Sequence, residues 1–262
     1  MPHPPDSILK FYKRNPDTRF YDYLAELTAP PAPVVFTRSL CENNTPVVTI
    51  AEIRSAKDLT PERKTNAKIL QVSESTVLKV GWRVSMTEAE ALILVAAKTS
   101  EPVPKVLSAY TIGDIGFILM SKVEGKLLSA CIDDMMLENR HAIADQLKAH
   151  VQEWRALHSS FLGSVDGGPC RDILFRHPWD YKSTKQYGPF DTLEKYNLGL
   201  VEALRSSRPD GVWYEKEEAL KERILSQSNR TLITLGALTH GDLHPGNIII
   251  RDGSISGIVD WG

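Results

Sequence analysis

Residues 240–261 read HGDLHPGNIIIRDGSISGIVDW, and this stretch decides which fold we expect for the chain. Two short apolar runs flank Asp252-Gly253, a dipeptide that is a strong signal for a tight β-hairpin turn. Asp242 precedes the hairpin, Asn247 stands at its mouth, and Asp260 ends its return strand. Because a hairpin brings its two ends together, we expect Asp260 to lie beside Asn247.

A carboxylate, an amide and a second carboxylate in this order suit phosphoryl transfer. The acceptor hydroxyl must be oriented and relieved of its proton, which a carboxylate such as Asp242 on a rigid loop can do. Mg²⁺ prefers oxygen ligands, which Asn247 and Asp260 would supply from neighbouring strands. The alternative for Asp242 alone is a turn residue, since aspartate is common in turns.

His240 and His244 are spaced as in a helical zinc pair. Pro245 and Gly246, which follow at once, argue against a helix that would carry both imidazoles. We therefore expect His240 to brace the loop through hydrogen bonds rather than to bind a metal.

A second hairpin is predicted upstream, where the β-prone runs 68–72 and 76–80 flank a Ser-Glu-Ser turn. Strand alternation places Val77, Lys79 and Gly81 on one face of this hairpin. Lys79 could be a solvated residue of an edge strand. It could instead face the next predicted helix, residues 87–98, where Thr87 and Glu90 fit a capping box.

The remaining pattern places mostly strands before residue 123 and mostly helices after it. Val47, Val48 and Ile50 could form a short strand, and residues 1–30 contain amphipathic helical stretches. The further expected elements are strands at 105–110 and 116–120, a linker at 123–126, helices at 143–157, 193–204 and 215–227, and a long loop at 163–190.

The segments HGDLHPGNI and IVDW resemble the catalytic loop and the metal-binding DFG counterpart of the aminoglycoside phosphotransferase and choline kinase superfamily, which is related to protein kinases. VLKVG, with Lys79, is similar to the strand that carries the family's phosphate-binding lysine. TEAEALILVAAKTSEPVPKVL is similar to the helix with that lysine's glutamate partner, and GFILMSKVEG to the hinge. GSVDGGPCRDILF and GPFDTLEKYN are similar to fungal members. The resemblance covers residues 68–262.

The resemblance implies an α+β, two-lobed protein-kinase-like fold. Residues 1–66 would form an N-terminal extension and the start of the N-lobe, residues 67–122 the small β-rich, nucleotide-binding N-lobe, and residues 123–262 the helical C-lobe. It also implies an ATP-dependent kinase that phosphorylates a small-molecule hydroxyl and binds ATP and Mg²⁺ between its lobes.

The resemblance further assigns roles to individual residues. Asp242 would be the catalytic base, on the loop that His240 braces, and Asn247 and Asp260 would hold Mg²⁺. Lys79 would contact the α/β-phosphates and pair with Glu90, with Glu88 as the alternative partner. Backbone groups of the hinge would bind adenine; these hinge residues are Met120, Lys122 and Val123.

Two features depart from the family pattern. No glycine-rich loop precedes Lys79, and the sequence stops at Gly262, directly after Trp261, where the family continues with several helices that shape the acceptor site. We therefore expect a truncated C-terminus. The missing C-terminal helices keep open the alternative of a catalytically weak or inactive nucleotide-binding pseudokinase. A protein kinase is a further alternative, which the missing glycine-rich loop and activation segment argue against.

Composition bounds the function classes. The net charge of −2 gives no electrostatic footprint for nucleic acid. The longest apolar run, residues 91–97, is far shorter than the about 20 residues of a membrane helix, and the N-terminus lacks a signal-peptide pattern. Three widely spaced cysteines indicate reduced thiols and a cytoplasmic protein. The expected partner is a small-molecule acceptor, with neither nucleic acid nor membrane, and the oligomeric state is left open.

Overall fold

The structure is a computed structural model that describes residues 24–25, 32–40, 45–61, 67–82, 84–175, 185–206, 211–227 and 236–261. Its residues form two compact units, one from 1–149 and 242–261 and the other from 150–241. The boundaries of these units differ from those of the three parts expected from the sequence. The three-part division stays a prediction.

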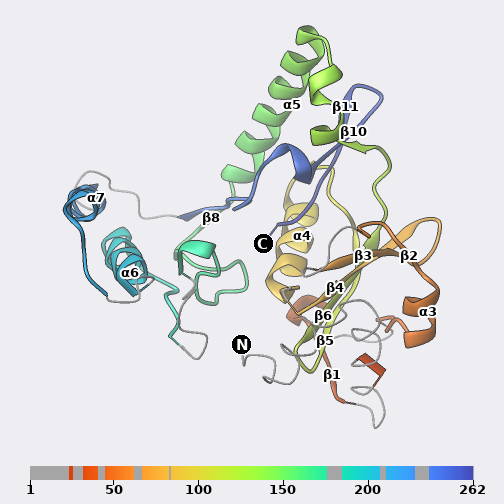
Figure 1. The fold of residues 1–262 in the computed structure, drawn as a ribbon, viewed down its shortest axis with the longest axis horizontal. Coiled ribbons are helices and arrows are strands. Elements are labelled where there is room, and N and C mark those ends of the chain that lie inside the picture. The colour runs from red at the N-terminus through yellow and green to blue at the C-terminus, as the bar shows by residue number, and fades with distance from the viewer. Residues whose placement is uncertain are drawn as a thin grey trace. The chain divides into compact units, whose positions relative to one another are not determined.

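The first unit contains a six-stranded antiparallel sheet with the strand order β1-β5-β6-β4-β3-β2 (Figure 1). The strands are β1 (Val34–Phe36), β2 (Lys57–Asp58), β3 (Lys68–Gln71), β4 (Thr76–Gly81), β5 (Val106–Ile112) and β6 (Ile115–Ser121). The hairpin predicted around the Ser-Glu-Ser turn is confirmed as β3–β4, and the two strands predicted on either side of Gly113-Asp114 are confirmed as β5–β6.

The prediction of a strand through Val47, Val48 and Ile50 is wrong. Ile50 begins the helix α3 (Ile50–Ser55), and Thr49 is its N-cap. The Thr49 side chain accepts a hydrogen bond from Glu52 N at 3.2 Å, while Glu52 Oε2 accepts from Thr49 N at 2.7 Å. This capping box satisfies donors at the helix N-terminus, and it outweighs the β-propensity of the valines.

Thr49→Ala removes the side-chain half of this capping box. We expect the free energy of unfolding to fall by about 1 kcal/mol, the usual cost of losing an N-cap hydroxyl. Urea denaturation of the variant and the wild type measures it. A loss near zero would show that α3 does not depend on its cap.

The expected capping box at Thr87 and Glu90 is also wrong. The helix α4 (Met86–Lys98) begins earlier, after the N-cap Ser85, whose side chain accepts a hydrogen bond from Thr87 N at 3.2 Å. α4 packs against β5 and β6.

The two faces of the sheet carry different side chains. On one face the buried Leu78, Val80 and Phe117 belong to a core cluster that extends to α3, and Tyr110 stacks on Phe117 with ring centroids 4.8 Å apart. Val80 lies opposite Phe117 in the pairing of β4 with β6, and Lys79 lies opposite Ile118. Because side chains alternate along a strand, Lys79 projects from the other face.

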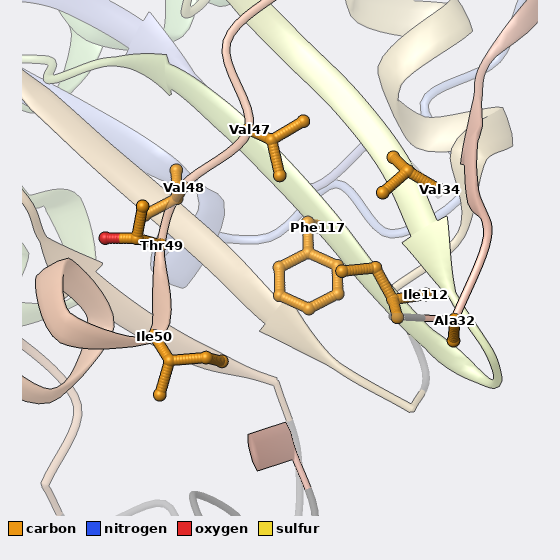
Figure 2. Close-up of a pocket in the computed structure, with 8 residues that line it drawn as sticks. All are labelled: Ala32, Val34, Val47, Val48, Thr49, Ile50, Ile112 and Phe117. Atoms are coloured by element: carbon orange, nitrogen blue, oxygen red, sulfur yellow. The ribbon is translucent and has the colours of Figure 1, made fainter. Parts of the chain in front are cut away.

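A hollow of about 390 Å³ opens on the core face, away from Lys79. Figure 2 shows its lining side chains, which are all apolar except one threonine: Ala32, Val34, Val47, Val48, Thr49, Ile50, Ile112 and Phe117.

A three-stranded sheet completes the first unit, with the order β11-β10-β7. The hairpin predicted at Asp252-Gly253 is confirmed as β10 (Ile248–Arg251) and β11 (Ser254–Ile258). The expected linker at 123–126 ends in β7 (Lys126–Leu127), which pairs with β10 and is followed by the short 3-10 helices η2 (Leu128–Ala130) and η3 (Ile132–Asp134).

The helix α5 (Leu137–Arg155) begins in the first unit, and its end belongs to the second. The second unit also contains β8 (His158–Ser159), η4 (Ile173–Phe175), α6 (Leu193–Ser206), α7 (Glu215–Ser226) and β9 (Gly236–Ala237). An aromatic cluster forms part of its core, with Phe175 close to the rings of Tyr187, Phe190 and Tyr196. α5, α6 and α7 confirm the helices predicted at 143–157, 193–204 and 215–227, with shifted ends.

Within the described residues, no helix is both long enough and apolar enough to cross a bilayer. Cys131 and Cys170 have free thiols, and Cys41 lies outside the described residues. The predicted helical stretches of residues 1–30 also lie outside them, except at Leu24 and Ala25, which are helical.

Candidate active site

Lys79 is the centre of a buried ionic cluster on β4. Its ammonium donates to both carboxylate oxygens of Glu88 on α4, at 2.7 and 2.6 Å. It also donates to Oδ1 of Asp260, just after β11. One cation therefore joins β4 to the helix that follows it and to a carboxylate 181 residues away.

The prediction that Lys79 pairs with Glu90 is wrong, and the alternative partner Glu88 takes its place. Glu90 accepts its hydrogen bonds from Thr37 and Ser39 instead. The reason is helical phase. Glu88 and Glu90 are two residues apart, about 200° around the helix, so Glu90 projects away from the sheet when Glu88 reaches Lys79.

The cluster holds one positive and two negative charges. Burial lowers the pKa of Lys79, but the charges of Glu88 and Asp260 outweigh burial, so the pKa is raised and the ammonium stays charged. For Glu88, burial raises the pKa, Lys79 lowers it, and the negative charge of Asp260 raises it again; the net direction is upward. The site thus has an excess of negative charge, which a further cation would relieve.

The loop before β10 places Asp242 next to Asn247. Asn247 is buried in the short 3-10 helix η6 (Pro245–Asn247), and its Nδ2 donates to the backbone oxygen of Asp242 at 2.9 Å and to Oδ2 at 3.4 Å. The Asp242 carboxylate itself is exposed, with 65% of its side chain accessible. A fixed amide thus positions a carboxylate that solvent or substrate can reach.

His244 belongs to the same loop, and no function was predicted for it beyond the zinc pair that Pro245 and Gly246 argue against. Its Nδ1 accepts a hydrogen bond from Gly246 N at 3.0 Å, which caps η6. Neutral His244 therefore carries its proton on Nε2, which lies 3.7 Å from Asp242 Oδ2. The polarised N–H points a partial positive charge toward the candidate base. The Pro-Gly that follows His244 was the available signal for such a cap.

The hairpin brings Asp260 back to Asn247, as expected. Val259 N donates to the backbone oxygen of Asn247 at 3.0 Å, and Asp260 follows directly. Asp260 has a φ of 67°, in the left-handed region that costs energy for residues other than glycine. Trp261 is buried and donates from Nε1 to Ile258 O at 3.1 Å, which anchors the chain on the far side of Asp260. The backbone is thus held so that the Asp260 carboxylate reaches Lys79.

His240 lies in the second unit, so only its surroundings there are described. It is buried at 3% exposure, and its ring centroid lies 6.5 Å from that of Trp154. Its expected function as a brace for the catalytic loop stays a prediction.

Of the predicted hinge residues, Met120 lies near the end of β6, and Lys122 and Val123 follow that strand. Met120 is buried opposite Val77, on the face of the sheet that carries Lys79. Lys122 N donates to Ser75 O at 2.8 Å, which ties the hinge to the β3–β4 turn. Val123 packs against Gly257 of β11 so closely that a Cβ there would lie 2.6 Å from Val123 Cγ1. Gly257 was not identified from the sequence, because only this contact requires it.

The sequence model of the APH family, described as "Phosphotransferase enzyme family", matches residues 69–262. The chain belongs to this phosphotransferase family. Its match covers Lys79, Glu88, the catalytic loop and Asp260, and the predicted resemblance is thereby confirmed. No sequence among the curated proteins matches this chain.

Solved aminoglycoside phosphotransferases share the fold of this family member. The apo form of a thermostable mutant of APH(4)-Ia is 15% identical, with a TM-score of 0.52 over 79% of this chain. A ternary complex of that protein with AMP-PNP and hygromycin B has a TM-score of 0.51 at the same identity. The chain spans 66% of the length of these neighbours. The likeness confirms the predicted kinase-like α+β fold.

Proposed function

We propose that the first unit binds Mg-ATP on the face of the sheet that carries Lys79, and that the chain transfers the γ-phosphoryl group to a hydroxyl of a small molecule. The observation that carries this proposal is the ionic cluster of Lys79, Glu88 and Asp260, next to the loop that holds Asp242 and Asn247. Membership in a phosphotransferase family supports it.

In this proposal Lys79 binds the α/β-phosphates, while Glu88 holds its ammonium in place. Asp242 orients the acceptor hydroxyl and takes its proton as the oxygen attacks the γ-phosphorus and the bond to ADP breaks. Met120, Lys122 and Val123 place their backbone groups along the adenine. His240 supports the catalytic loop from the chain that precedes Asp242.

The donor set near Asp260 fits Mg²⁺. Asn247 commits its amide nitrogen to Asp242, which leaves its carbonyl oxygen for a cation, and Asp260 offers a carboxylate. The excess negative charge of the cluster also favours a bound cation. When bound, Mg²⁺ neutralises charge on the phosphates during transfer. Asp260 must then exchange part of its contact with Lys79 for the metal.

The acceptor is proposed only as a class, a hydroxyl-bearing small molecule. A neighbour of the same fold binds hygromycin B together with ADP or AMP-PNP, which supports testing aminoglycosides among other small alcohols. Nothing in the described site favours a pseudokinase, because Asp242, Asn247 and Asp260 are all present. A cytoplasmic location remains a proposal from the sequence.

The proposal predicts that nucleotide binding depends on magnesium through Asp260. Calorimetric titration of the wild type with AMP-PNP should give an affinity at least about tenfold higher with Mg²⁺ than with a chelator, roughly the 1.4 kcal/mol of one good charge-assisted contact. Asp260→Asn should remove most of this difference. Asp58→Asn, which removes a carboxylate paired with Lys68 in the same sheet, should keep it. Equal wild-type affinity in both conditions would refute the metal site.

A further inference from the structure

Glu90 of α4 binds a segment that lies before the family match. Thr37 Oγ1 donates to Glu90 Oε1 at 2.5 Å, Ser39 N donates to the same oxygen at 2.9 Å, and Ser39 Oγ donates to Oε2 at 2.5 Å. We call residues 34–40, which comprise β1 and the 3-10 helix η1 (Arg38–Leu40), the N-terminal clasp. Both oxygens of Glu90 are thus committed to the clasp.

The N-terminal clasp is itself fixed to the sheet. β1 pairs with β5, and Thr37 N extends this pairing by donating to Ala109 O at 3.0 Å. Leu40 N donates to Thr37 O at 3.1 Å, which closes η1, and Thr37 is buried. Glu90 therefore holds α4 to an anchor that is part of the sheet.

The start of α4 is held from two sides. Glu88 reaches Lys79 on β4, and Glu90 reaches the clasp, about 200° away around the helix axis. Rotation or sliding of α4 would break both sets of bonds at once. The two contacts therefore oppose rotation of the helix from opposite sides.

Glu90 remains charged in this contact. Burial raises its pKa, but the hydrogen bonds from Ser39 and Thr37 and the nearby charge of Arg38 outweigh burial, so the pKa is lowered. Because the pKa of Glu90 is lower in the folded protein than in the unfolded chain, the charged carboxylate stabilises the contact at pH values above the unfolded-state pKa. This stabilisation is lost as the pH falls through the folded-state pKa. The bonds from the clasp are therefore charge-assisted at neutral pH.

We propose that Glu90 is a positioning residue that, by holding α4 to the N-terminal clasp, keeps Glu88 on Lys79 and makes nucleotide binding depend on a segment outside the family match. The inference rests on the proposed function, because its consequence is felt at the phosphate-binding lysine. It also gives residues 34–40 a function that the family resemblance does not supply.

The experiment measures Mg-AMP-PNP affinity by calorimetry on the full chain. Glu90→Ala, and separately Thr37→Val combined with Ser39→Ala, should weaken binding by about 5- to 50-fold, within the about 100-fold that a misplacement of about 1 Å can cost. Glu90→Gln keeps an acceptor oxygen for the clasp and should stay within about threefold of the wild type, since neutral hydrogen bonds are weaker by a modest factor. Thr49→Ala is the matched control, because it removes a hydroxyl cap in the same unit away from α4; its affinity should be unchanged.

A double-mutant cycle separates positioning from general destabilisation. If Glu90 acts through Glu88, then Glu90→Ala added to Glu88→Ala should weaken binding by less than about twofold further, a strongly non-additive result. Additive losses in the cycle, or wild-type affinity in Glu90→Ala, would overturn the inference while nucleotide binding by the wild type stands. A wild-type chain that binds no Mg-AMP-PNP would overturn the proposed function, and the inference with it.

Discussion

Asp242→Ala is expected to lower the rate of phosphoryl transfer by about 10²- to 10⁴-fold, the usual contribution of a positioned general base. The Asp242 carboxylate is exposed at the mouth of the loop, where it can reach an acceptor, and Asn247 fixes its backbone. Alanine removes the proton acceptor but leaves the Asn247 bond to the backbone oxygen. The fold and the affinity for Mg-AMP-PNP should therefore change little.

Steady-state ATP consumption with an acceptor that the wild type uses would measure this loss, and calorimetry would check nucleotide binding. Asp252→Asn provides the matched control. Asp252 lies in the turn of the same hairpin with a φ of 51°, and asparagine tolerates this left-handed conformation. Turnover should be unaffected in the control. Wild-type turnover in Asp242→Ala would remove Asp242 from the base position.

Lys79→Met should weaken Mg-AMP-PNP binding by about 10- to 150-fold, which corresponds to the about 1.5–3 kcal/mol of a charge-assisted hydrogen bond to phosphate. The loss has a second cause. Without the ammonium, the buried Glu88 and the nearby Asp260 have no common counter-ion. The pKa of Glu88 would then rise further, since burial and Asp260 raise it and the charge of Lys79 is what lowers it.

Lys68→Met is the control for this variant. Lys68 is also buried in the same sheet, on β3, and pairs with Asp58 at 2.7 Å. Both variants remove a buried ammonium from an ion pair, so both should lower the free energy of unfolding. Only Lys79→Met should lower nucleotide affinity. Equal affinity losses in the two variants would show that the effect is one of stability rather than of phosphate binding.

Local signals in the sequence determined the hairpins and the order of the candidate site residues. The Asp252-Gly253 turn and the Ser-Glu-Ser turn each join strands that are adjacent in the chain, so a few residues suffice to define them. Asp242, Asn247 and Asp260 lie on or next to one such hairpin. Their proximity therefore followed from the turn, and the family match agrees with it.

Local signals failed where two patterns competed. Thr87 with Glu90 matches a capping box, but Ser85 caps α4, and Glu88 rather than Glu90 reaches Lys79. Thr49 with Glu52 forms a capping box, and it starts α3 at Ile50, which the strand prediction included. In each case a side-chain hydrogen bond to the helix N-terminus decides where the helix begins, and several residues offer one.

Taken by itself, then, the sequence determined the family, the loop that carries the candidate residues and the alternation that turns Lys79 away from the core face of the sheet. Tertiary structure alone decided which glutamate meets Lys79, and that Glu90 instead binds the N-terminal clasp. It also decided that Gly257 must lack a side chain where Val123 packs. The physical reason is that the rotation of α4 against the sheet decides between Glu88 and Glu90, while the contacts of Glu90 with the clasp and of Val123 with Gly257 join segments far apart in the chain. No short stretch of sequence encodes either.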